Sequence, residues 1–201
     1  MNHLAHFHLA WPGEGLVAGA LEGDFHRGLL PGCLPRELVD GVALHRAIDG
    51  FTDGHQMLAG IRSRFGANHR RYAGILLDLS FDHFLSLHWS RFSDIDLDAF
   101  ATQVYSILRR NTHLLSDKAQ RAAEWLEGYN VLCRYQHPQA IHRAAARVGE
   151  RLRGDNPLGH SEEILTPLLP DIEQAFLSFY PALIRFSANN DKLAPPGNET
   201  S

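Results

Sequence analysis

The stretch that decides the fold is LLDLSFDHFLSLHW, residues 76–89. Leu, Phe and Trp dominate it and no Gly or Pro interrupts it, so we predict a helix that is buried for most of its length. The same stretch carries Asp78, Asp82 and His83. Burying a carboxylate is costly unless the group is paired or bound to a metal, so this helix marks a candidate site.

The spacing of these polar residues favours a common cluster. Asp78 and Asp82 are four residues apart, which puts both carboxylates on one face of the predicted helix. His83 is turned by about 100° from Asp82 and could join the cluster from the side or support it. The alternative is structural: Asp78 would be a cap or surface residue, and His83 a core histidine. Two acids beside an imidazole on one apolar helix favour the functional interpretation.

A second cluster lies in VALHRAIDGFTDG, residues 42–54. His45, Asp49 and Asp53 follow one another at intervals of four residues, which is one stripe of a helix. A His and an Asp four residues apart can provide two metal ligands. Arg46 and Asp49 could equally form an ordinary surface ion pair, and the spacing alone does not separate these alternatives.

Two further segments carry weaker signals. Residues 19–28, GALEGDFHRG, place Asp24 near the end of a predicted helix, where acidic residues are common. Residues 2–10, NHLAHFHLA, place Asn2 and His6 four residues apart beside an apolar side. These histidines could equally serve packing or capping.

Taken together, three predicted helices bring acidic and imidazole groups from apolar surroundings, and no Cys accompanies them. Mixed oxygen and nitrogen ligands suit Mn²⁺, Fe²⁺ or Mg²⁺ better than a closed structural zinc site. Such an ion can bind phosphate oxygens and activate a water molecule. The sequence has no phosphate-binding loop, nucleophile elbow or dinucleotide fingerprint.

The whole chain has 201 residues, of which 44% are apolar and 21% charged, enough for one globular domain. Alternating β-branched stretches are scarce, so we predict an all-α fold, an irregular helical bundle. We expect one domain over residues 1–187 and a disordered tail over 188–201. Helices are predicted near residues 2–11, 15–28, 35–50, 54–65, 70–89, 96–110, 116–134, 138–153 and 161–187.

The charges are unevenly distributed. The formal charge of −4 does not suggest a nucleic-acid partner, yet seventeen Arg stand against two Lys. Arginines one helical turn apart, as at 143, 147 and 151, usually form the solvated face of a helix. In a chain of net negative charge they also suit docking of an acidic partner. The candidate docking residues are Arg62, Arg64, Arg70, Arg71, Arg143, Arg147 and Arg151.

The sequence also indicates where the protein works. Cys33 and Cys133 are a hundred residues apart, which fits neither a disulfide framework nor a zinc ribbon. The beginning of the chain does not resemble a signal peptide, and no apolar run of about 18 residues predicts a membrane span. We therefore predict a cytoplasmic protein.

Four segments in this order and spacing resemble the acyl carrier protein phosphodiesterases. They are MNHLAHFHLA (1–10), GDFHRG (23–28), HRAIDGFTD (45–53) and LDLSFDHFLSLHW (77–89). The resemblance implies a Mn²⁺-preferring hydrolase that removes 4′-phosphopantetheine from holo-acyl carrier protein and leaves the apo form. It also implies an all-helical fold related to the HD-type phosphohydrolases.

The resemblance suggests roles for individual residues. Asp24, His45, Asp78 and Asp82 are the predicted metal ligands. Asp49, His83 and Arg46 are the predicted catalytic residues, with Arg46 or Arg27 neutralising the phosphate. The adjacent pair of the HD proteins is His then Asp, whereas this chain has Asp82 then His83. Which of the two would bind the metal therefore stays open.

Two rival functions remain at this point. An HD-like phosphohydrolase acting on a nucleotide or small phosphate ester would use the same metal. It would not need Arg143, Arg147 and Arg151. A helical binding module would use its His and Asp residues only for hydrogen bonds in the core.

Overall fold

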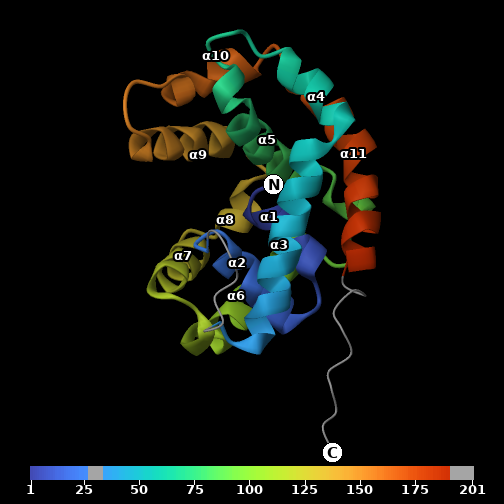
Figure 1. Ribbon diagram of the computed structural model, residues 1–201, viewed down its shortest axis with the longest axis vertical. Helices are drawn as coiled ribbons and strands as arrows, with labels where there is room; N and C mark the ends of the chain where they lie inside the picture. Colours follow the sequence, from blue (N-terminus) through green and yellow to red (C-terminus); the bar gives the residue numbers. More distant parts are fainter. Residues whose placement is uncertain (27–33, 191–201) are drawn as a thin grey trace, which may run out of the picture.

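The computed structural model describes residues 1–26 and 34–190, which are helical and contain no strand (Figure 1). The predicted all-α class is confirmed. Within these residues no helix has the length and apolarity needed to cross a bilayer. In chain order the elements are α1 (His3–Ala10), α2 (Glu14–Gly23), α3 (Arg36–Gly54), α4 (Gln56–Ser63), η1 (Arg70–Tyr72), α5 (Ala73–Leu87), η2 (Trp89–Arg91), α6 (Leu97–Arg110), η3 (Thr112–Leu114), α7 (Asp117–Gly128), α8 (Val131–Arg134), α9 (Pro138–Arg151), η4 (Pro157–His160), α10 (Ser161–Leu165) and α11 (Leu169–Asn190).

Two predicted helices are each divided in the structure. The one predicted at 116–134 is interrupted at Asn130, whose φ of 44° is a left-handed conformation that Asn tolerates and that separates α7 from α8. The one predicted at 161–187 is divided into α10 and α11, and α11 continues to Asn190. The helix predicted at 15–28 ends at Gly23, and residues 188–190 of the predicted tail are still helical in α11. Residues 27–28 and the tail beyond 190 lie outside the described residues.

The centre of the molecule is α5, the apolar helix predicted at 70–89. It packs against α1, α9 and α11, and most of its side chains are buried (Figure 1). Phe81 is fully buried against the rings of Phe176 and Phe179 of α11. The polar residues of α5 are therefore carried into the interior by the burial of its aromatic and aliphatic neighbours.

The closest helix packing is between α2 and α3. Gly15, Gly19 and Gly23 form one stripe of α2, and it faces α3. A Cβ atom at Gly19 would lie 2.5 Å from the carbonyl oxygen of Leu38, so only glycine permits this approach. The stripe brings the end of α2 against the middle of α3, beside His45.

Candidate metal centre

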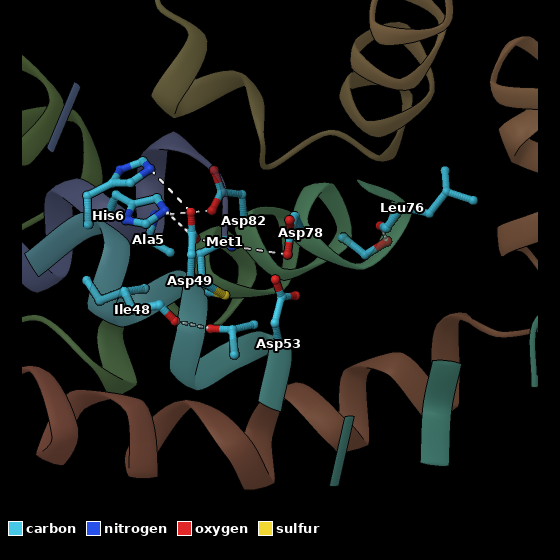
Figure 2. A network of polar contacts seen from close by, with 12 residues as sticks. Met1, Ala5, His6, Ile48, Asp49, Asp53, Leu76, Asp78 and Asp82 are labelled. Atoms are coloured by element: carbon cyan, nitrogen blue, oxygen red, sulfur yellow. Dashed lines mark hydrogen bonds and ion pairs between the residues drawn. The ribbon is translucent and has the colours of Figure 1, made fainter. Parts of the chain in front are cut away.

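Three side chains from two helices meet beside the start of the chain. They are His6 of α1 and His45 and Asp49 of α3, and their ligand atoms all lie within 4.8 Å of one another. The Oδ1 atom of Asp49 is 3.1 Å from Nε2 of His6 (Figure 2). The Oδ2 atom of Asp49 is 3.3 Å from Nε2 of His45. The two imidazole rings are stacked, with centroids 3.9 Å apart. We call these three residues the metal centre.

The local sequence explains how the metal centre forms. His45 and Asp49 are one turn apart on α3, so their side chains share a face. His6 comes from α1, where Leu4 and Phe7 are buried and fix the helix against its neighbours. Both imidazoles are buried, whereas the Asp49 side chain is 42% exposed. The imidazoles therefore form an inner wall and the carboxylate faces the solvent.

Asp24 lies at the edge of the metal centre, just beyond the end of α2. Its Oδ1 atom is 3.8 Å from Nε2 of His45, and its Oδ2 atom is 3.4 Å from Nδ1 of His3. Burial raises the pKa of Asp24, but the hydrogen bond from His3 and the charges of the neighbouring histidines together outweigh burial and leave the pKa below its usual value. Asp24 is thus an ionised, partly exposed carboxylate beside the imidazole of His45.

Asp78 approaches from α5. The buried amino group of Met1 is 3.1 Å from Oδ1 of Asp78 and 3.2 Å from Oδ1 of Asp49 (Figure 2). Burial lowers the pKa of this amino group, but the two carboxylates outweigh it and raise the pKa to about 10. Because both carboxylates contact one nitrogen atom, Asp78 and Asp49 lie side by side.

The electrostatics of the centre favour a neutral His6 and an ionised Asp49. Burial and the neighbouring His45 lower the pKa of His6 to about 4. Burial raises the pKa of Asp49, but hydrogen bonds from His45 and His6 outweigh it and place the pKa well below the usual range. A neutral His6 beside an ionised Asp49 offers lone pairs to a cation, as a metal ligand must.

The two histidines also leave nitrogen atoms unused. Among the described residues, Nδ1 of His6 and Nδ1 of His45 are buried without a hydrogen-bond partner. Unsatisfied buried nitrogens are uncommon in folded proteins. Together with the absence of sulfur from the group, they fit a divalent ion with nitrogen and oxygen ligands.

The structure does not bring Asp82 into this group. Asp82 is fully buried, and its two oxygens accept hydrogen bonds from the backbone N–H groups of Leu4, at 2.8 Å, and Ala5, at 3.1 Å. Burial raises its pKa to about 7, although these two hydrogen bonds act in the opposite direction. Asp82 therefore satisfies N–H groups at the start of α1, the helix that carries His6.

His83 also has its own contact. Its Nδ1 atom is 2.6 Å from the backbone carbonyl oxygen of Tyr135, which follows α8. Burial holds the pKa of His83 below its usual value, so the neutral ring donates this hydrogen bond. The neighbours Asp82 and His83 thus contact α1 and the segment after α8, respectively.

The other predicted residues of α3 lie around the centre. Arg46 donates a hydrogen bond to the backbone carbonyl of His26, at 3.0 Å, which brings its positive charge to the side where α2 ends. Asp49 contacts the two imidazoles rather than Arg46. Asp53 faces the surface and pairs with Arg62. Arg27 lies outside the described residues.

The predicted docking arginines divide into two groups. Arg62 and Arg64 have acidic partners, Asp53 at 2.9 Å and Asp171 at 2.6 Å, and Arg71 stacks on the ring of Tyr72. Arg70 is exposed nearby. The second group lies on α9, where Arg143 and Arg147 line a cavity and Arg151 is exposed beyond it.

Sequence reasoning missed two features of the centre. The local sequence offers for His6 only its spacing from Asn2, because nothing local indicates that α1 lies across α3. Gly23 was also missed: a Cβ atom there would lie 2.5 Å from Cγ of His45. The repeat of Gly15, Gly19 and Gly23 at four-residue intervals is the signal that could have revealed this close packing.

The model of the family "Acyl carrier protein phosphodiesterase" matches residues 1–183. The acyl carrier protein phosphodiesterase of Klebsiella pneumoniae (strain 342) is 35% identical over 202 residues, covering 94% of this chain and 98% of the relative. That of Photorhabdus laumondii is 31% identical, covering 95% of this chain and 97% of the relative.

No solved structure matches the chain, so the predicted likeness to the HD-type fold stays a prediction. The match of the family model extends from the α1 residues of the metal centre to α11. It confirms the resemblance that four short segments indicated. The chain belongs to the acyl carrier protein phosphodiesterase family.

Proposed function

We propose that this protein hydrolyses the phosphodiester between 4′-phosphopantetheine and a serine of holo-acyl carrier protein. Water adds to phosphorus, the bond from phosphorus to the serine oxygen breaks, and apo-acyl carrier protein and phosphopantetheine are released. The observation that carries the proposal is the meeting of His6, His45 and Asp49 within 4.8 Å in a chain of this family.

We propose Mn²⁺ as the ion, with Mg²⁺ or Fe²⁺ as alternatives, because the ligands are nitrogen and oxygen atoms without sulfur. His6, His45 and Asp49 would hold it, and Asp24 and Asp78 are the nearest further carboxylates. When bound, such an ion supplies charge neutralisation for phosphate and a water of lowered pKa.

The remaining residues act around the phosphate. The ionised carboxylate of Asp24 is the base that accepts a proton from the attacking water, since it is partly exposed beside His45. Arg46 contributes positive charge for the phosphate oxygens at the end of α2. Asp82 and His83 act by position: the first holds α1, and the second holds the segment after α8.

We further propose that residues 1–187 form a single hydrolase domain working in the cytoplasm. One continuous cluster of buried apolar side chains includes residues from Met1 to Leu183. A free thiol at Cys133 accords with a reducing compartment.

Mass spectrometry of holo-acyl carrier protein incubated with the purified protein and Mn²⁺ tests the function. We expect the carrier to lose the mass of phosphopantetheine and to gain a free serine hydroxyl. Chelation with EDTA should stop the reaction, and added Mn²⁺ should restore it. An unchanged carrier mass with metal-loaded protein would rule the function out, and full activity after complete metal removal would rule out the metal centre.

A further inference from the structure

The second feature of the molecule is a cavity between α7, α8 and α9. Its volume is about 520 Å³. α9 packs against α5 and η4, whereas α7 packs against α6 and α8, so α7 and α9 lie apart (Figure 1). We call it the α7–α9 groove, and its principal lining residues are Trp125, Tyr129, Arg134, Tyr135, Arg143 and Arg147.

The walls of the groove combine an apolar surface with room for a ligand. Trp125 is half-buried, and the side chain of Tyr129 is 51% exposed, an unusual position for a large ring. Ala140 and Ala144 lie one turn apart on α9 and also line the groove, so their small side chains leave space between the helices. Aromatic residues and arginine are enriched at protein interfaces, and this groove combines both.

The charge of the groove is entirely positive. Three arginines and His137 belong to its described lining, which includes no Asp or Glu, although the chain as a whole has a formal charge of −4. Arg147 lies over the ring of Trp125 at 5.1 Å, and Arg134 lies over Tyr129 at 5.9 Å. Stacking on a ring holds a guanidinium in place without neutralising it. Arg62 and Arg64, by contrast, already have carboxylate partners.

We propose that the α7–α9 groove binds an acidic amphipathic helix on the surface of the protein substrate. The apolar face of that helix would lie against Trp125 and Tyr129, and its carboxylates would pair with Arg143 and Arg147. The proposal rests on the proposed function, because it takes the substrate to be a carrier protein, and it names the surface that recognises it.

The position of the groove relative to the metal centre supports this assignment. Tyr135 lines the groove, and its hydroxyl accepts a hydrogen bond from the side chain of Asn2, directly before α1. The carbonyl of the same Tyr135 is bonded to His83 of α5. A protein held in the groove would therefore contact Tyr135, which is hydrogen-bonded to the residue before α1, the helix that carries His6.

The double variant Arg143→Glu, Arg147→Glu tests the proposal. Both side chains are exposed, so the fold should persist. We expect the KM for holo-carrier to rise about tenfold or more, with kcat at saturation unchanged, because the lost contacts are electrostatic and neither arginine belongs to the metal centre. Binding of apo-carrier, followed by fluorescence anisotropy, should weaken by a similar factor.

A matched control carries the same change in charge elsewhere. Arg91 and Arg185 are exposed and lie outside the groove, so Arg91→Glu, Arg185→Glu should leave the KM and apo-carrier binding near wild type. Hydrolysis of bis(p-nitrophenyl) phosphate should be the same in all three proteins. Tyr129→Ser provides a second test without a charge change, and it should also weaken apo-carrier binding.

Three outcomes would overturn the proposal. The first is apo-carrier binding that the groove variants do not weaken, as expected if the groove holds only the pantetheine arm. The second is an equal loss in the control variant, which would indicate overall charge alone. The third is loss of bis(p-nitrophenyl) phosphate hydrolysis in the groove variants, which would place the defect in the centre. A wild-type protein that releases no phosphopantetheine would instead refute the proposed function, and the apo-carrier measurement would still decide the groove.

Discussion

The metal centre and the α7–α9 groove use charged side chains in opposite ways. In the centre the imidazoles of His6 and His45 are buried and contact the carboxylate of Asp49. In the groove Arg143 and Arg147 are exposed, and Arg147 lies over an aromatic ring. Buried groups keep a fixed geometry, which catalysis requires. Exposed charges attract a partner protein and tolerate substitution of single residues.

The largest effect is expected from Asp49→Asn, which keeps the volume of the side chain but removes its charge. Asp49 contacts both imidazoles, so we expect kcat to fall by more than about a hundredfold, beyond the usual loss for a residue that only supports a ligand. Bound metal, measured on the purified protein, should fall with it. Apo-carrier binding should not change; a parallel loss of binding would show that the two regions are not separate.

Gly23→Ala should disturb the centre through packing alone. The new Cβ atom would lie 2.5 Å from His45, so the ring or the helices must move. We expect stability to fall by about 1–3 kcal/mol and kcat by roughly tenfold to a hundredfold.

Gly60→Ala is the matched control for this substitution. Gly60 lies in α4 and has no neighbouring atom within 4 Å of an added Cβ, so stability should rise by about 0.5–1 kcal/mol. Urea titration and steady-state kinetics measure both variants. If stability and kcat changed equally in the two variants, the α2–α3 contact would not position His45.

Asp82→Ala should act on the fold more than on the chemistry. It removes the acceptor for two N–H groups of α1, and we expect the free energy of unfolding to fall by about 3 kcal/mol. Ser80→Ala, also fully buried on α5, loses a bond only to Leu76 within the helix and should cost about 1 kcal/mol. Urea titration would contradict this role of Asp82 if both variants lost equally little stability.

The smallest effect is expected from His83→Asn, since an Asn amide can donate to the Tyr135 carbonyl as the imidazole does. We expect kcat to stay within about threefold of wild type, whereas a general acid or base would cost a hundredfold or more. Steady-state kinetics with holo-carrier measures the difference. A hundredfold loss would assign His83 to the reaction itself and connect the two regions chemically.

Part of the site followed from sequence. The pairing of His45 with Asp49 needs only the helical repeat, and the burial of α5 follows from its run of apolar residues. His6 could not be assigned in this way. Its approach to Asp49 spans 43 residues and depends on how α1 packs. The same limit applies to Asp82, whose spacing from Asp78 suggested a common cluster, but whose carboxylate contacts the backbone of α1.

The sequence by itself determined the helical class, the family and the acidic and imidazole residues available to a site, because periodicity and short segments are local properties of the chain. Only the tertiary structure decided which of these groups meet. The physical reason is that the meeting depends on contacts between distant segments. The glycine stripe lets α2 approach α3, Asp82 satisfies the start of α1, and the divergence of α7 and α9 leaves a groove with unneutralised arginines.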